Sequence, residues 1–425
     1  MTAFLLLSFL VLLAIGVPVA IALGGASLLH VMAEDLSPHL VVIHRMVSGV
    51  DSFPLLAIPF FIMAGSLMNS AGITARIYDF ALALVGWLRG GLGHVNVVGS
   101  VIFAGMSGTA VADAGGLGNI EIKAMRDHGY EVDFAVGITG ASSTIGPIIP
   151  PSLPMVIYGV MANCSIGQLF AAGLLPGLLM AATMMAMVAW YAHVRGFRRD
   201  AAFAWARLAF TFRRAFLPLM TPVLLIGGMT SGLFTPTEAA IAATAYALVL
   251  GLFVYRTLSL RGLVRVSMET VETTAIILFI VAGASIFGYI ITTTKVTDQV
   301  ADLVLSVTRE PWIVLLLVNI FLLVVGCFME TIAAITILVP VLLPLVTQVG
   351  VDPVHFGLIM VLNLMIGLLT PPVGMVLYIL ARVADISFER TTRACLPFLV
   401  PLVATLGIVT YWPGFVLLLP TYLYR

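Results

Sequence analysis

Long apolar stretches run along almost the whole chain, and most could cross a membrane. A helix needs about 20 apolar residues to span the hydrocarbon layer. The pattern predicts such helices near residues 4–32, 53–71, 133–162, 168–194, 214–232, 236–256, 265–292, 354–382 and 394–420. The first stretch lacks the basic flank of a signal peptide and stays apolar too long for one, which indicates a membrane helix. We therefore expect an all-α polytopic membrane protein.

Two further apolar stretches, 94–126 and 311–348, are interrupted near their middle by small or polar residues. Irregular backbone is tolerated at membrane depth only where protein or a water-filled cavity surrounds it. Each stretch therefore predicts a re-entrant helical hairpin rather than a simple crossing. Two amphipathic segments, 73–89 and 297–308, could be interfacial arm helices or short spans, and their pattern favours arms.

Basic residues in the predicted loops indicate the orientation of the chain. The loop 195–214 holds six arginines against one acid, Asp200, and Arg256, Arg261 and Arg265 mark a second basic loop two helices later. Short loops rich in Arg and Lys stay in the cytoplasm. This assignment places the two hairpins on opposite sides of the membrane. We expect a multi-pass protein of a bacterial inner membrane with a cytoplasmic N-terminus.

The composition excludes a water-soluble globule. Of 425 residues, 61% are hydrophobic and 9% are charged, whereas a soluble domain carries about 25% charged residues. The bilayer must therefore cover the outer surface. The formal net charge is zero, which gives no indication of a nucleic-acid partner. The three cysteines form no metal-binding spacing and are expected to be small buried hydrophobes.

The two halves of the chain share a repeated sequence. Residues 145–158 match 366–378 with one insertion, and Gly146, Pro150 and Pro151 recur as Gly367, Pro371 and Pro372. Because the basic loops orient the halves oppositely, the match predicts two inverted-topology repeats, a feature typical of transporters. The first repeat (1–212) would hold the hairpin 94–126 and the broken helix 133–162, and the second (213–425) would hold the hairpin 311–348 and the broken helix 354–382.

Each repeat carries two consecutive prolines inside an apolar helix. A proline in a helix interior removes a hydrogen bond and clashes with the preceding turn, so both helices should unwind there. The freed carbonyls suit a hard cation such as sodium, and the helix ends suit an anion. The oxygen-bearing residues beside the two breaks are Ser142, Ser143, Thr144, Asn363 and Thr370.

The middle of each hairpin supplies further polar groups. The first carries Ser107, Gly108, Thr109 and Asp113, and the second carries Glu330 and Thr331. Ionisable residues at membrane depth are functional candidates by default, so we expect this set to contribute to a solute site. The alternative is that the small residues only permit close helix packing. Asp113 or Glu330 could also accept a proton or lie at the wet edge of a hairpin.

Four segments together resemble a known family: SGTAVADAGGLG (107–118), SSTIGPIIPPS (142–152), FTPTEAAIAA (234–243) and GLLTPPVGMVLY (367–378). They are similar to the large membrane subunit of TRAP (tripartite ATP-independent periplasmic) transporters, across essentially the whole chain. The resemblance implies a sodium-driven elevator, in which a transport domain moves against a scaffold. It also implies a small four-helix membrane subunit, a periplasmic solute-binding protein and an organic-acid substrate.

The resemblance also implies ligands for Na⁺, the coupling ion, through carbonyl and hydroxyl oxygens. One site would use Ser107, Gly146, Ile149 and Pro151, and the other would use Gly326, Gly367, Thr370 and Val373. Many family members have Ser-Gly-Ser at the first hairpin tip, where this chain has Ser107-Gly108-Thr109. With no arginine or lysine near these positions, an anionic solute would depend on helix N-termini and sodium.

Other functions remain open on the sequence alone. A stand-alone ion-coupled anion carrier of the same two-hairpin fold would need no binding protein. A channel is a weaker alternative, because the duplicated site suits alternating access better. The chain has no HExxH, GxSxG or GxxxxGK[ST] motif, so we expect neither an intramembrane enzyme nor an ATPase.

Overall fold

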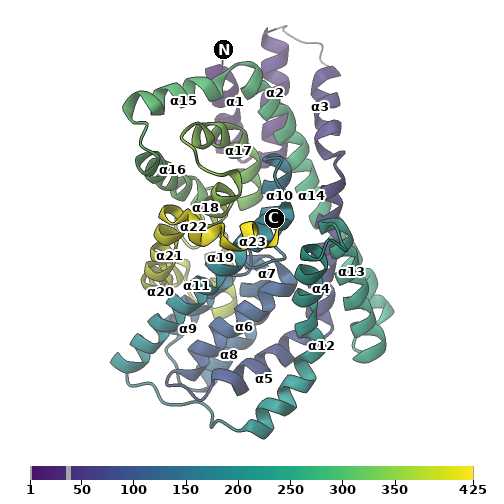
Figure 1. Ribbon diagram of the computed structural model, residues 1–425, viewed down its shortest axis with the longest axis vertical. Coiled ribbons are helices and arrows are strands. Elements are labelled where there is room, and N and C mark those ends of the chain that lie inside the picture. The colour runs from purple at the N-terminus through teal and green to yellow at the C-terminus, as the bar shows by residue number, and fades with distance from the viewer. Residues whose placement is uncertain (1, 35–39, 425) are drawn as a thin grey trace.

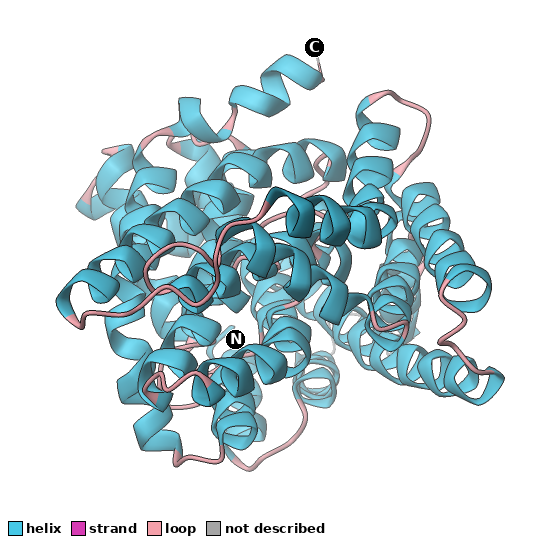
Figure 2. Cartoon of the chain, turned by 90° about the horizontal axis from the view of Figure 1, so that it is seen from below, coloured by secondary structure: helices cyan, strands magenta, loops and turns pink. Residues whose placement is uncertain are grey.

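The computed structural model describes residues 2–34 and 40–424, and this part of the chain consists of helices and loops, with no β-strand (Figure 1, Figure 2). Its segments that are long and apolar enough to cross a membrane are Phe53–Ser70, Ile166–Val194, Trp205–Thr230, Pro236–Val254, Leu260–Thr293, Thr331–Gln348 and Phe388–Tyr411. Shorter apolar helices lie between them. The prediction of an all-helical, multi-pass membrane protein is confirmed.

One group of helices, which we call the panel, is organised around α14. Its members are α1 (Thr2–Ala14), α2 (Val19–Glu34), α3 (Leu40–Val50), α4 (Ala57–Ser70), α12 (Trp205–Thr230), α13 (Pro236–Val249) and α14 (Leu260–Thr293). Helix α14 packs against α2, α3 and α4, and α13 packs against α4. With 34 residues, α14 is about 50 Å long, and the hydrocarbon core is about 30 Å thick. It must therefore tilt or extend beyond the bilayer.

The second group, which we call the bundle, contains both hairpins. Its members are α6 (Gly91–Ser107), α7 (Ala110–Ala112), α8 (Gly118–Asp127), α9 (Val132–Ser143), α10 (Leu153–Met161), α11 (Ile166–Val194), α16 (Pro311–Gly326), α17 (Thr331–Gln348), α18 (Pro353–Gly367), α19 (Met375–Ala384), α20 (Phe388–Cys395) and α21 (Leu399–Tyr411). Buried aliphatic and aromatic side chains fill the space between these helices.

Two shorter helices connect the panel and the bundle at opposite ends of the molecule (Figure 1). Helix α5 (Ile73–Val85) packs against α6 and α12, and α15 (Val296–Val307) packs against α17 and α14. At 13 and 12 residues, each is about 20 Å long, which is too short for an upright crossing. These lengths agree with the arm helices that the sequence favoured.

Both predicted hairpins and both predicted helix breaks are present. In the first hairpin, the Asn96 side chain of α6 donates to Glu121 of α8 at 2.7 Å, which places the tip near Gly108. In the second, α16 and α17 pack together around the turn at 327–330. Residues 144–152 separate α9 from α10, and residues 368–374 separate α18 from α19. The re-entrant course of the hairpins, the inverted relation of the two halves and the boundary at residue 212 remain predictions.

Two predicted spans have different limits in the structure. The stretch 4–32 is two helices, because Gly16 takes the left-handed conformation (φ +86°) and Pro18 cannot continue the helix, so α2 packs against α1. The stretch 394–420 is a helical segment over Phe388–Tyr411 followed by two short helices, α22 (Pro413–Val416) and α23 (Leu418–Leu423). Pro413 stands at the new helix start, where a missing N–H is tolerated.

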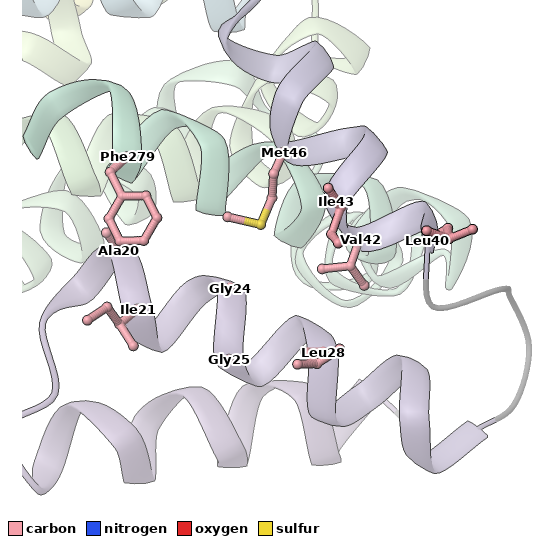
Figure 3. Close-up of a pocket in the computed structure, with 10 residues that line it drawn as sticks. All are labelled: Ala20, Ile21, Gly24, Gly25, Leu28, Leu40, Val42, Ile43, Met46 and Phe279. Carbon is pink, nitrogen blue, oxygen red and sulfur yellow. The ribbon is translucent and has the colours of Figure 1, made fainter. Parts of the chain in front are cut away.

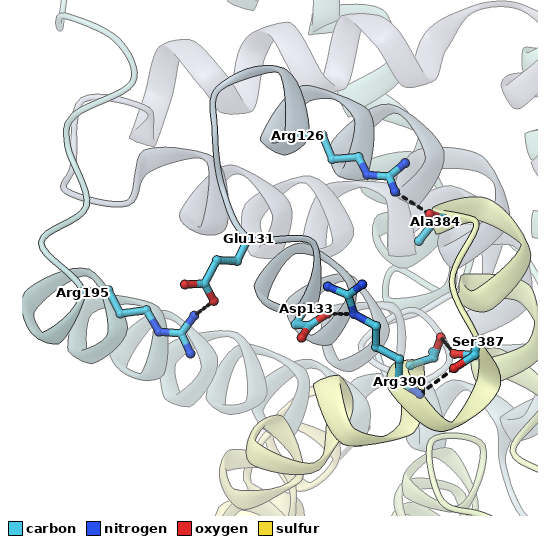
Figure 4. Close-up of polar contacts among 8 residues, drawn as sticks. Arg126, Glu131, Asp133, Arg195, Ala384, Ser387 and Arg390 are labelled. Atoms are coloured by element: carbon cyan, nitrogen blue, oxygen red, sulfur yellow. Dashed lines mark hydrogen bonds and ion pairs between the residues drawn. The ribbon is translucent and has the colours of Figure 1, made fainter.

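Polar contacts connect one end of the bundle (Figure 4). They link Arg126 to the Ala384 carbonyl at 2.6 Å, Asp133 to Arg390 at 2.6 Å, and Glu131 to Arg195. The two ion pairs are partly exposed, and such pairs contribute only about 0–1 kcal/mol each. Their main significance is positional, because all three contacts lie at the end of the bundle that carries Arg195, which belongs to the loop that the sequence assigned to the cytoplasm.

The second hairpin touches the second broken helix through two glycines. A Cβ atom on Gly367 would lie 2.5–2.7 Å from backbone atoms of Gly326. We predict that Gly367→Ala destabilises the protein by about 1–3 kcal/mol, because neither backbone can move aside freely. The melting temperature in detergent should fall, whereas Gly407→Ala in α21, with nothing within 4 Å, should not lower it. Equal melting temperatures for both variants would contradict the tight contact.

Candidate functional site

Four helices begin around one small cavity in the bundle. The cavity measures about 70 Å³ and is lined by Thr109, Ala110, Val111, Pro147, Leu153, Pro154, Glu330, Thr331, Ile332, Met365, Leu368 and Met375. These residues include the first residues of α7, α10, α17 and α19. Helix N-termini carry positive partial charge. The cavity therefore combines favourable helix ends for an anion with a lining that contains no arginine or lysine.

The N-termini at the cavity differ in how their amides are satisfied. The Glu330 carboxylate caps α17 by accepting from the Ile332 and Ala333 amides at 2.9 and 3.1 Å. The Ser152 hydroxyl accepts from the Met155 amide of α10 at 3.3 Å. Helix α19 starts after Gly374 without a side-chain cap. Its Val376 and Leu377 amides donate instead to the Leu368 and Gly374 carbonyls at 3.2 and 2.8 Å, so backbone carbonyls satisfy part of this helix end.

The first hairpin tip is pressed against the first helix break. A Cβ atom on Gly108 would lie 2.4 Å from the Pro151 carbonyl oxygen, and one on Gly146 would lie 3.5 Å from the Thr109 carbonyl oxygen. The Ser107 hydroxyl is buried without a hydrogen-bond partner. The structure thus brings together Ser107, Gly146 and Pro151 from the expected first sodium set. Ile149 lies in the same break, and its side chain faces Gly177.

The second tip and break meet in a similar way. Gly326 lies against Gly367, and the Val373 amide donates to the Cys327 carbonyl at 3.1 Å. The Thr370 hydroxyl donates to the Ile366 carbonyl at 2.9 Å. These contacts gather the segments that carry Gly326, Gly367, Thr370 and Val373. Thr331, beside the cavity, has a buried hydroxyl without a partner.

Several predicted solute residues lie outside the cavity lining. Ser143 and Thr144 donate to the Gly140 and Ala141 carbonyls, within or just after α9. Ser142 donates to the Asn96 side chain of α6 at 2.6 Å. Buried hydroxyl groups are usually satisfied in this way, so here these side chains connect helices and stabilise a helix end.

Asn363 and Asp113 also lie away from the cavity lining. Asn363 donates to the Asn319 side chain of α16 at 2.7 Å, and Asn319 donates in turn to Thr410 of α21 at 3.0 Å. Asp113 is only 1% exposed and lies inside the first hairpin. Asp113 is two residues from the lining residue Val111, and Asn363 is two residues from the lining residue Met365. Each lies on another side of its helix, because a helix presents only one side to a given space.

A second cavity, which the sequence reasoning missed, separates the first hairpin from the panel. It measures about 170 Å³ and is lined by Ile62, Gly65, Ser66, Asn69, Phe103, Ser107, Thr109, Ala112, Leu153 and Thr273. Thr109 and Leu153 line both cavities. A Cβ atom on Gly65 would lie 3.1 Å from the Met106 carbonyl oxygen, so α4 approaches the hairpin tip closely. No short motif in α4 distinguishes these polar residues from ordinary packing residues.

A larger cavity, about 460 Å³, lies elsewhere, in the panel (Figure 3). Its lining comes from α2, α3 and α14, including Gly24, Met46 and Phe279, and consists of apolar side chains and glycines. No hairpin or helix break reaches it. An ion or a charged solute would find no polar side chain there, so size alone does not identify the site.

Comparison with known proteins identifies the family of the chain. Residues 6–415 match the family model described as the DctM component of the tripartite ATP-independent periplasmic transporter. The chain belongs to the DctM family. It is a large permease of a TRAP transporter, which confirms the resemblance. The related proteins are transporter permeases, not enzymes.

Three relatives show the range of the DctM family. The sialic acid TRAP transporter large permease SiaM of Vibrio cholerae is 48% identical over 96% of each chain. The C4-dicarboxylate large permease DctM of Pseudomonas aeruginosa is 39% identical over 95% of this chain and 94% of its own. The sialic acid permease SiaT of Haemophilus influenzae is 44% identical over 98% of this chain but only 68% of its own.

One solved structure shares the fold of this DctM protein. The Alcanivorax borkumensis YdaH transporter, described as having an unusual topology, aligns with a TM-score of 0.62 over 88% of this chain and 87% of its own. The two sequences are 14% identical, so the likeness concerns the fold alone.

Substitution of Gly108 tests whether transport depends on the close contact between the first hairpin tip and Pro151. Gly108 has φ +62° as well as the 2.4 Å approach, whereas Gly72 has φ +66° and nothing within 4 Å. We predict that Gly108→Ala reduces solute uptake in proteoliposomes about tenfold or more, since a clash of 1–3 kcal/mol would displace the tip. Gly72→Ala, which carries the same backbone strain, should retain most uptake. Equal losses of uptake in both variants would show that backbone strain, and not the contact with Pro151, causes the loss.

Proposed function

We propose that this chain is the large membrane subunit of a sodium-coupled secondary transporter that imports an organic acid. A periplasmic solute-binding protein delivers the acid, and transport follows an elevator-type alternating-access mechanism. The observation that supports this most is the meeting of two hairpin tips and two helix breaks around one cavity. In transporters, such interrupted helices mark the solute and ion positions.

The two tip–break contacts are the proposed sodium positions. Sodium prefers several oxygen ligands, and unwound backbone supplies carbonyl oxygens without burying a carboxylate charge. At the first position the Ser107 hydroxyl is buried and unpartnered, so it is available as a ligand beside Gly146, Ile149 and Pro151. At the second, Gly326, Gly367, Thr370 and Val373 surround the other break. Bound sodium would supply positive charge next to the solute.

The organic acid is proposed to bind between these positions. Helix α19 begins at the cavity without a side-chain cap, so its positive end would favour a carboxylate there, and Thr109 and Thr331 provide hydroxyl groups at the same cavity. The cavity of about 70 Å³ is smaller than a typical ligand pocket of about 300 Å³ or more. The adjoining cavity of about 170 Å³ shares its lining, so a larger solute would extend toward α4.

We propose an elevator movement because the helices form two groups, the panel and the bundle. The bundle holds both proposed sodium positions, whereas the panel helices α2, α3, α4, α13 and α14 pack mainly on one another. Helices α5 and α15 bridge the two groups at opposite ends. The bundle would then be the transport domain and the panel the fixed scaffold.

The partners are proposed from the family. The isethionate permease DctMQ of Oleidesulfovibrio alaskensis is matched over 96% of this chain but 64% of its own length, and SiaT is similarly longer. These single-chain relatives support a separate small four-helix membrane subunit as the partner of this chain. A panel surface rich in exposed large apolar side chains, such as Val249, Met268 and Val271, is compatible with lipid and such a subunit.

Uptake measurements test the proposal as a whole. Proteoliposomes with this chain and its small subunit would receive labelled organic acids, with sialic acid first because two relatives are named for it. We expect uptake only when an inward sodium gradient and the cognate binding protein are both present. Uptake with sodium alone would instead favour the stand-alone carrier, and uptake indifferent to sodium would refute the coupling.

Removing one hydroxyl tests the first sodium position. We predict that Ser107→Ala raises the sodium concentration for half-maximal uptake about tenfold or more, because a bond to a charged partner contributes about 1.5–3 kcal/mol. Ser231→Ala in the panel, whose hydroxyl only contacts the Gly228 carbonyl, should leave this concentration unchanged. An unchanged sodium concentration for half-maximal uptake in Ser107→Ala would show that Ser107 is not a sodium ligand.

A further inference from the structure

The first hairpin contains two buried acids that the proposed solute and sodium positions do not use. Asp113 and Glu121 are each 1% exposed, and neither lines the two cavities beside the hairpin tip. Both lie on the return segment, Asp113 at the start of a π-helical turn (Asp113–Leu117) and Glu121 in α8. Both face α6, the outgoing helix of the same hairpin.

The contacts of these carboxylates leave several polar atoms unmatched. Glu121 Oε2 accepts from Asn96 at 2.7 Å, but Glu121 Oε1 has no hydrogen-bond partner. Oε1 lies beside Gly99, where an added Cβ atom would be 2.9 Å from it. The Ser100 hydroxyl faces Asp113. Yet neither Asp113 oxygen nor Ser100 Oγ, itself fully buried, makes a hydrogen bond of normal geometry. Asp113 and Glu121 are close enough to repel each other.

No basic side chain in the described part of the hairpin offsets this charge. From α5, Tyr78 is close to Glu121, Arg76 stacks on the Tyr255 ring at 3.5 Å, and Asp79 is exposed.

His94 lies two residues before Asn96 and so points to the other side of α6. The remaining charged groups on neighbouring elements are engaged or exposed: Arg126 at the Ala384 carbonyl, Asp133 with Arg390, and Lys123 and Arg382 at the surface.

Two ionised carboxylates in this position would be very unfavourable. A buried charge without a partner neutralises rather than remaining ionised, and two neighbouring carboxylates cannot both ionise easily. One proton would remove half of the charge and provide a donor for the unmatched oxygens. We propose that Asp113 and Glu121 form a proton-binding site inside the first hairpin, with the Ser100 hydroxyl beside it.

The site gives uptake a defined pH dependence. At neutral pH the pair holds its proton, and the hairpin carries one buried negative charge. In alkaline solution the proton is lost, two charges repel inside the hairpin, and its packing against α6 is disfavoured. Uptake should therefore fall several-fold as pH rises. Glu121→Gln and Asp113→Asn leave one carboxylate without a repelling neighbour, so this alkaline fall should disappear in both.

Infrared spectroscopy of the purified full-length protein tests the proton directly, without reference to solute or sodium. The wild type should show the carbonyl band of a protonated carboxyl group at neutral pH, shifted in D₂O and lost in alkaline buffer. Glu121→Gln and Asp113→Asn each place an amide donor beside the remaining carboxylate, which can then stay ionised, so each variant should lose this band. Asp127→Asn, an exposed acid at the end of the same hairpin, should keep the wild-type band and the wild-type pH profile.

Either of two results would overturn the proposal. One is a wild-type spectrum without a protonated-carboxyl band at neutral pH, including the case in which a bound cation replaces the proton. The other is an alkaline fall in uptake that is the same in the wild type and both variants. Because the spectrum needs no transport, a failure of the sodium-coupled import model would leave it interpretable.

Discussion

Backbone that unwinds at membrane depth must find partners within the protein, and this constraint shapes the centre of the molecule. Lipid offers no hydrogen bonds, so irregular segments survive there only when protein or a cavity surrounds them. The hairpin tips meet this need. The Cys327 carbonyl accepts from Val373 across the second contact, and Gly108 lets the first tip reach Pro151. The glycines at these contacts are required because a side chain would separate the two backbones.

The same constraint determines how the protein handles charge. The cavity between the tips has no arginine or lysine in its lining, and its favourable field for an anion comes from helix N-termini. The α17 end is already capped by Glu330, and backbone carbonyls accept from the Val376 and Leu377 amides of α19. A centre built from carbonyls and helix ends would bind a cation and an anion without fixed basic charge, in keeping with the proposed movement of the bundle across the bilayer.

The sequence predicted the arrangement of helices well, and the reasons are physical. Apolar length identified the spans, and the Pro-Pro pairs located both breaks because prolines interrupt helices regardless of tertiary context. The split at Gly16 and Pro18 was missed because the stretch is apolar throughout. Within the site, backbone positions such as Gly108 and Gly367 were easier to predict than side chains. Whether Ser142 or Asn363 faces a cavity or a neighbouring helix depends on helix rotation, which hydrophobicity in a uniformly apolar bundle does not reveal.

The most direct test of the central claim is an experimental high-resolution structure of the permease with its small subunit, determined in sodium and in its absence. We expect ion density at Ser107, Gly146 and Pro151 and at Gly326, Gly367 and Thr370. We also expect that added solute occupies the cavity between Thr109 and Thr331. Ion or solute density confined to other parts of the protein, with both tip–break contacts unchanged by sodium, would contradict these expectations.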